Sequence, residues 1–202
     1  MGASRLKFVS PTWDKIYSQS ILLAEKLRRH DDGGHYDSLV GVSRGGLALA
    51  RIMSDLLSIQ KVLITRCEYY TDLGTTRKKP IISQKISGEI RGENVLLVDD
   101  VADTGGSLIE LKRYLLSKKP RKVTIATLYI KPWTKVMPDY HVASTSSWII
   151  FPWELLEAIQ SISSKSTKDG GSALLRKTHI PERYLRRLKA LDEMANKDVS
   201  SN

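Results

Sequence analysis

Short hydrophobic runs alternate with amphipathic stretches between residues 39 and 130. The runs have the length and the aliphatic composition of buried strands. Between them, apolar residues recur at the spacing of a helix. We expect strands at residues 39–42, 62–65, 95–98 and 123–130, and helices at 47–57 and 108–116. Strands that alternate with helices predict an α/β fold, built on a parallel sheet with right-handed crossovers.

Helices are also expected on both sides of this region. Ser10 and Pro11 are typical of the N-cap and first position of a helix, and the following apolar residues recur at helical spacing up to Leu27. A short helix should end near Ile159. The last helix should cover residues 181–194, and its Arg and Lys residues lie opposite an apolar face.

Three stretches show no such regularity. Residues 68–85 are too polar for a core strand and are long for a loop, which is typical of a lid or of a disordered segment. Residues 131–148 are irregular. Residues 161–172 are rich in Ser, Gly and Lys and are typical of a linker.

Length and composition narrow the class of protein. The chain has 202 residues, which suits one α/β domain with small additions. Its only cysteine, Cys67, excludes a disulfide framework, and no signal peptide or membrane span is visible. We therefore expect a cytoplasmic protein without a membrane partner. The net charge of +10 suits nucleic acid, an anionic substrate or a solvated surface, and its spread along the chain favours the last two.

The segment VLLVDDVADTGGSL, residues 95–108, carries the strongest chemical signal. A strand that ends in a Gly-rich turn at a helix N-terminus presents backbone N–H groups to an anion. A turn for phosphate alone would not need carboxylates, so Asp99, Asp100 and Asp103 indicate a ligand that is part anion and part polyol, with Mg²⁺ between them. The alternative is an ordinary strand–turn–helix with acidic capping residues.

This segment resembles the phosphoribosyl-pyrophosphate (PRPP) motif of the type I phosphoribosyltransferases, and the resemblance extends over residues 39–154. It implies a parallel sheet flanked by helices, with a small hood around residues 131–154. Here a C-terminal helical extension would be added. It also implies transfer of ribose 5-phosphate from PRPP to a base with Mg²⁺. The implied PRPP-binding residues are Asp99, Asp100, Asp103, Thr104, Gly105, Gly106 and Ser107, with Asp99 and Asp100 also contacting the metal, Asp100 through water.

The turn GVSRGG, residues 41–46, is similar to the pyrophosphate loop of bacterial xanthine-guanine phosphoribosyltransferases. The small residues alone would fit ordinary packing at a strand–helix turn. The resemblance implies that Ser43, Arg44 and Gly45 contact pyrophosphate, with a non-proline cis peptide near Ser43-Arg44.

Lys131, which follows a strand and precedes Pro132, and the aromatic Trp148 suit a flat 6-oxopurine. In the 6-oxopurine enzymes of this family such a lysine contacts O6, the aromatic ring stacks on the base, and the next backbone, here Ile149, reads the C2 substituent. The resemblance also makes Asp103 the catalytic base near N7. Glu154 stands where the family has an aspartate beside a metal-bound water. Trp133 and Trp153 are interpreted as structural.

We expect a Mg²⁺-dependent purine-salvage enzyme that converts guanine, hypoxanthine or xanthine to its nucleotide. The expected division is a catalytic domain at residues 1–160, followed by a linker and helical tail at 161–202. The resemblance implies a homo-oligomer, a dimer or tetramer. The alternatives are a PRPP-sensing regulator of the same fold that binds nucleic acid, and an enzyme for another base. The retained Asp103 argues against the first, and Lys131 with Trp148 argues against the second.

Overall fold

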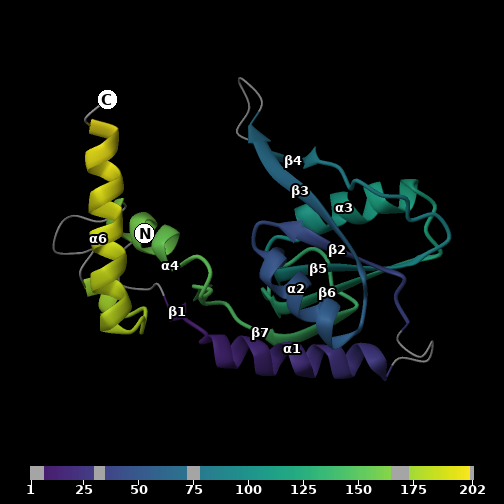
Figure 1. Ribbon diagram of the computed structural model, residues 1–202, viewed down its shortest axis with the longest axis horizontal. Helices are drawn as coiled ribbons and strands as arrows, with labels where there is room; N and C mark the ends of the chain where they lie inside the picture. Colours follow the sequence, from purple (N-terminus) through teal and green to yellow (C-terminus); the bar gives the residue numbers. More distant parts are fainter. Residues whose placement is uncertain (1–6, 30–34, 72–77, 165–172, 201–202) are drawn as a thin grey trace. The chain divides into compact units, whose positions relative to one another are not determined.

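The computed structural model describes residues 7–29, 35–71, 78–164 and 173–200. It contains two compact units (Figure 1). The central unit covers Tyr17–Thr145, and the terminal unit combines Met1–Ile16 with Ser146–Asn202. Each unit has its own cluster of buried hydrophobic residues.

The central unit is built on a six-stranded sheet with the order β4-β3-β2-β5-β6-β7. All neighbouring strands are parallel except β3 and β4. The strands are β2 (Ser38–Ser43), β3 (Lys61–Thr71), β4 (Lys78–Gln84), β5 (Asn94–Ala102), β6 (Lys122–Ile130) and β7 (Tyr140–Ser144). The four predicted strands and the parallel α/β class are confirmed, and each strand is longer than its apolar run.

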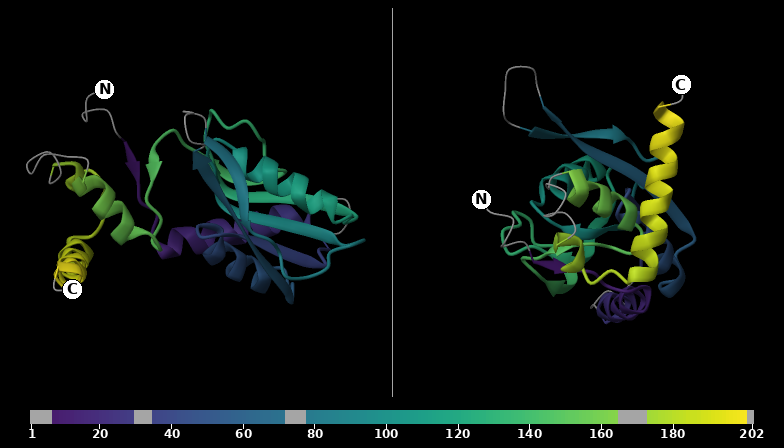
Figure 2. Two further views of the ribbon diagram at one scale, coloured as in Figure 1. Left: turned by 90° about the horizontal axis from the view of Figure 1, so that it is seen from above. Right: turned by 90° about the vertical axis from the view of Figure 1, so that its left-hand side faces the viewer.

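Helices cover both faces of this sheet (Figure 2). Helix α3 (Gly106–Ser117) packs its Leu108, Leu111 and Leu115 against Val40 and Leu97 in the main core. Helix α2 (Gly46–Leu56) covers the opposite face, where Gly41 of β2 meets Ala50. Alternate strand residues point to opposite faces, so both sides of the central strands are apolar.

The stretch 68–85 is not the long loop that its polarity predicts. Residues 68–71 are the end of β3, which pairs antiparallel with β4 at residues 78–84. Residues 72–77 lie outside the described part. Cys67 pairs with Ile82, and both pack against the core. One side of the pair faces solvent and carries Glu68 and Lys79 together with the exposed Ile81. The alternation of apolar and polar residues is therefore incomplete, and this weakened the strand signal.

A second correction concerns residues 131–148, which contain the edge strand β7 and the start of the two-residue strand β8 (Trp148–Ile149). Among the described strands β7 pairs with β6 alone, and its residues Tyr140–Ala143 are half-buried. An edge strand needs no long apolar run, so periodicity did not reveal it.

In the terminal unit, β1 (Phe8–Val9) pairs in parallel with β8. Helices α4 (Leu155–Ser164) and α6 (Glu182–Ser200) share a small core with Ile150, Leu174 and Leu175. Both helices run further than predicted. Residues 161–164 of the expected linker are helical, and 165–172 lie outside the described residues.

Helix α1 (Trp13–Arg28) begins two residues later than predicted. The Ser10 hydroxyl donates to the carbonyl oxygen of Thr178 instead of capping the helix. The capping contact comes from Thr12, whose Oγ1 accepts from the Lys15 amide at 3.2 Å. Of the helices in the described ranges, none combines the length and the apolar character that crossing a membrane requires.

Candidate functional site

The predicted site lies where β2, β5 and β6 end, at the carboxyl edge of the central sheet. Ligands of open α/β sheets bind at this edge. The β5–α3 turn contains Gly105 in the left-handed conformation, with φ +80°. A Cβ at Gly105 would come within 2.9 Å of the Val136 backbone nitrogen, so only glycine fits here. Gly105 is also the N-cap of α3 and has no side chain that could cap it, so the first amides of α3 are open to an anion.

A cavity of about 410 Å³ opens at this turn. Its lining includes five of the predicted residues, namely Asp99, Asp103, Thr104, Gly105 and Ser107. The volume lies within the range of about 300–1,000 Å³ that is usual for small-molecule sites. The structure therefore brings the predicted phosphate turn and two of the three carboxylates to one hollow.

The cavity also contains Tyr69, to which the sequence analysis gave no role. Tyr69 is on β3, and its hydroxyl lies 3.1 Å from Oγ1 of Thr104. Strand β3, which contains the first residues of the polar stretch, therefore reaches the phosphate turn. The sequence pattern did not predict the β3–β4 hairpin and indicated a loop at residue 69. The position of a loop tyrosine cannot be predicted, so the contact of Tyr69 with Thr104 was not expected.

Asp99 and Asp100 form a close acidic pair within β5. Asp100 is buried, and its amide donates to Oδ1 of Asp99 at 3.0 Å. Burial and the neighbouring Asp100 charge raise the pKa of Asp99 well above its ordinary value. A divalent cation at the pair would favour the ionised forms and oppose that shift.

The hard oxygen donors of this pair suit Mg²⁺. Among the described residues, no three His, Cys, Asp or Glu side chains gather as a metal-binding group. Mg²⁺ usually keeps several waters and is held by one or two carboxylates together with substrate phosphates. The acidic pair therefore fits this mode of binding.

The β2–α2 turn lies directly against the acidic pair. The Ser43–Arg44 peptide is cis, as the resemblance implies. A Cβ at Gly45 would collide with the carboxylate of Asp100, so the close approach of the two segments requires glycine. The predicted pyrophosphate loop and the predicted ribose and metal residues are thus neighbours.

Trp133 contacts both Lys131 and Asp103, although the sequence analysis interpreted it as structural only. The indole Nε1 of Trp133 donates to Oδ1 of Asp103 at 2.9 Å. The Lys131 ammonium lies 5.6 Å from the centre of the Trp133 ring. Burial lowers the pKa of Lys131, and the charge of Asp103 opposes this shift. The sequence feature that could have pointed to Trp133 is its position directly after the Lys-Pro pair at the strand end.

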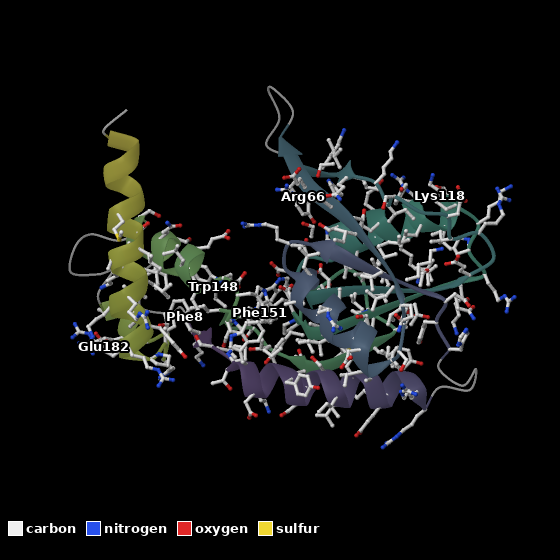
Figure 3. All side chains as sticks on the ribbon, viewed as in Figure 1. Phe8, Arg66, Lys118, Trp148, Phe151 and Glu182 are labelled. Carbon is white, nitrogen blue, oxygen red and sulfur yellow. The ribbon has the colours of Figure 1, made fainter. Side chains whose placement is uncertain are left out.

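Trp148, Ile149 and Glu154 belong to the terminal unit. Trp148 packs on Phe8 with ring centres 5.7 Å apart (Figure 3), and Ile149 is buried. Oε1 of Glu154 accepts from the Phe151 amide at 3.2 Å, just before α4. Trp153 stacks on Phe151 at 4.8 Å, which agrees with a structural role. The base and metal contacts of the first three residues stay predictions.

Comparisons with known proteins agree with the family resemblance of the sequence. A family model described as a phosphoribosyl transferase domain matches residues 12–158. A xanthine-guanine phosphoribosyltransferase of Cereibacter sphaeroides is 34% identical over 149 residues, covering 71% of this chain and 85% of that protein. One from Ruegeria sp. is 33% identical over 152 residues, covering 71% and 84%.

Among solved structures, a purine phosphoribosyltransferase from Pyrococcus horikoshii OT3 is similar with a TM-score of 0.64 and 36% identity. The match covers 72% of this chain and 93% of that one. The family match ends at residue 158, so helix α6 and the residues just before it lie outside it.

Proposed function

The chain belongs to the phosphoribosyl transferase domain family, and from this membership we propose that it transfers 5-phosphoribosyl from PRPP to a 6-oxopurine, releasing pyrophosphate. The base would be guanine, hypoxanthine or xanthine. One observation carries the choice of base: Trp133, beside the phosphate turn, contacts the Lys131 ammonium through its ring and donates a hydrogen bond to Asp103.

In this proposal the β5–α3 turn holds the 5′-phosphate. The backbone amides of Gly105, Gly106 and Ser107 would donate to its oxygens, and the Thr104 and Ser107 hydroxyls would add donors. The supporting observation is the cavity at this turn, together with the left-handed Gly105 that shapes it. A phosphate would also meet the Tyr69 hydroxyl near Thr104.

Asp99 and Asp100 would hold the ribose hydroxyls and Mg²⁺, with Asp100 acting through water. Glu154 is a further candidate for a metal-bound water. When bound, Mg²⁺ supplies charge neutralisation for the leaving pyrophosphate. Ser43, Arg44 and Gly45 would contact that pyrophosphate, since their turn lies against Asp100.

The proposed contacts to the base are those that distinguish a 6-oxopurine. The Lys131 ammonium would donate to O6, Trp148 would stack on the ring, and the Ile149 backbone would read the C2 substituent. Asp103 would accept or stabilise the N7 proton while the bond to ribose forms through an oxocarbenium-like state. Trp133 supports this role because it fixes one carboxylate oxygen of Asp103.

We further propose a cytoplasmic homo-oligomer, a dimer or tetramer, without a nucleic-acid partner. A single cysteine suits a reducing compartment. Residues 17–145 hold the phosphate turn, the acidic pair, Lys131 and Asp103 in one unit, which supports an enzyme over a regulator that has lost catalytic groups.

A steady-state assay with PRPP and a panel of purine and pyrimidine bases tests this function. We expect Mg²⁺-dependent turnover with at least one 6-oxopurine and release of pyrophosphate. PRPP binding without turnover on any base would support the sensor alternative. Preferential turnover of a pyrimidine or of adenine would contradict the role of Lys131.

Replacement of Lys131 by alanine should raise KM for the oxopurine far more than KM for PRPP. The variant removes the donor to O6 and leaves the phosphate turn in place. Lys135→Ala is the matched control, because it removes an exposed lysine from the same loop. Equal effects of Lys131→Ala on both Michaelis constants would remove Lys131 from the base site.

A further inference from the structure

The terminal unit contains a second cavity, of about 480 Å³, which the proposed reaction does not use. One wall is formed by residues 10–14 at the start of α1, and another by residues 179–181, 183 and 184 at the start of α6. Pro152 and Leu155 complete it. The family match ends at residue 158, so this second wall lies outside it.

The lining combines exposed aromatic rings with charge. Trp13 is 56% exposed and Tyr184 is 43% exposed, although both line the cavity. The Arg183 guanidinium lies 4.9 Å from the centre of the Tyr184 ring. Asp14 and His179 add polar groups to the rim, while buried Pro11 and Ile180 supply an apolar floor.

We propose that this cavity binds a planar aromatic anion, of which a purine nucleotide is the best-fitting class. Exposed Trp and Tyr rings offer stacking surfaces, and the face of a purine base stacks favourably on such a ring. The Arg183 guanidinium can donate two parallel hydrogen bonds to a phosphate. The Asp14 carboxylate can accept from ring N–H or exocyclic amino groups of the base.

An apolar ligand would pack on the floor and the rings but would make no polar contact with Arg183, Asp14 or His179. Inorganic phosphate would satisfy Arg183 alone. A nucleotide uses both sets of groups, and the cavity volume lies within the usual range of roughly 300–1,000 Å³ for such ligands. Since a nucleotide is also the product in the proposed function, this second site would be a place for regulation by purine nucleotides.

Nucleotide binding in the presence of saturating Mg²⁺ and PRPP tests the site, because PRPP then occupies the catalytic cavity. The probe is GMP, with guanosine and inorganic phosphate measured in parallel by calorimetry and tryptophan fluorescence. We expect one GMP to bind per chain, and both guanosine and phosphate to bind at least tenfold more weakly.

Two variants should raise the Kd for GMP about tenfold or more while leaving basal turnover unchanged. Arg183→Gln removes the anion contact, and Tyr184→Ala removes a stacking ring. Arg187→Gln is the matched control, since it removes an exposed arginine of α6 that does not line the cavity. Unchanged melting temperatures would show that the variants stay folded.

Absence of GMP binding at saturating PRPP would overturn the second site. So would equal weakening by Arg187→Gln, and guanosine or phosphate binding as tightly as GMP would overturn the ligand class. A wild-type protein that bound no PRPP would contradict the proposed function instead. The comparison between Arg183→Gln and Arg187→Gln would still test the second site.

Discussion

Replacing Asp103 by asparagine should lower kcat for the oxopurine by about 10²–10⁴-fold, the range for loss of a general base. Oδ1 of Asp103 accepts from Trp133, so the proposed mechanism assigns Oδ2 to the base. In the variant the side-chain oxygen can still accept from Trp133. The amide nitrogen then stands in place of Oδ2 and presents a donor where the mechanism needs an acceptor.

Single-turnover kinetics with saturating PRPP and hypoxanthine would measure this loss, with PRPP binding measured in parallel. PRPP affinity should change little. Asp55→Asn is the matched control, because it removes an exposed carboxylate from α2. Turnover near the wild-type rate would exclude the mechanism, and loss of PRPP binding alone would assign Asp103 to the phosphate site.

Trp133→Phe extends the same test to the residue that the sequence analysis interpreted as structural only. Phenylalanine keeps a ring near Lys131 and removes the donor to Asp103. We expect kcat to fall about tenfold, as for loss of one hydrogen bond to a charged group. A merely structural tryptophan would instead change the melting temperature and leave kcat of the folded enzyme unaltered.

The central sheet could be predicted because its inner strands are buried on both faces. Residues 95–98 and 123–130 are continuous apolar runs, and such runs mark the strands of parallel sheets. The glycine turn after β5 was equally clear, since Gly105 is required by its backbone conformation. Local sequence therefore determined the position of the phosphate turn and of the acidic pair.

The edges of the sheet were not predictable in the same way. Strands β4 and β7 each have one neighbour in the sheet, so they carry polar residues and lack the apolar signal. The position of Tyr69 beside Thr104 depends on the hairpin, and the contact between Trp133 and Asp103 depends on the path of the loop after β6. Both are tertiary contacts between residues distant in the sequence, and periodicity carries no information about them.

Asp100→Ala should weaken Mg·PRPP binding by roughly 10–100-fold, the usual cost of removing a group that supports a metal through water. Asp100 is buried at the end of β5 and lies against Gly45 of the predicted pyrophosphate loop. The variant therefore removes one negative charge from the metal position and the contact that brings the two loops together. Asp100→Asn keeps the shape and removes only the charge.

Titration of PRPP at several Mg²⁺ concentrations separates these two contributions. If charge dominates, Asp100→Asn should bind Mg·PRPP as weakly as Asp100→Ala, and excess Mg²⁺ should restore part of the affinity in both. If the packing against Gly45 dominates, Asp100→Asn should bind nearly as well as the wild type. Since Asp99 would remain as the only carboxylate of the pair, its pKa should fall toward the ordinary value in either variant, because the neighbouring charge that helps to raise it is gone. An unchanged dissociation constant for PRPP in both folded variants would remove Asp100 from the ribose and metal site.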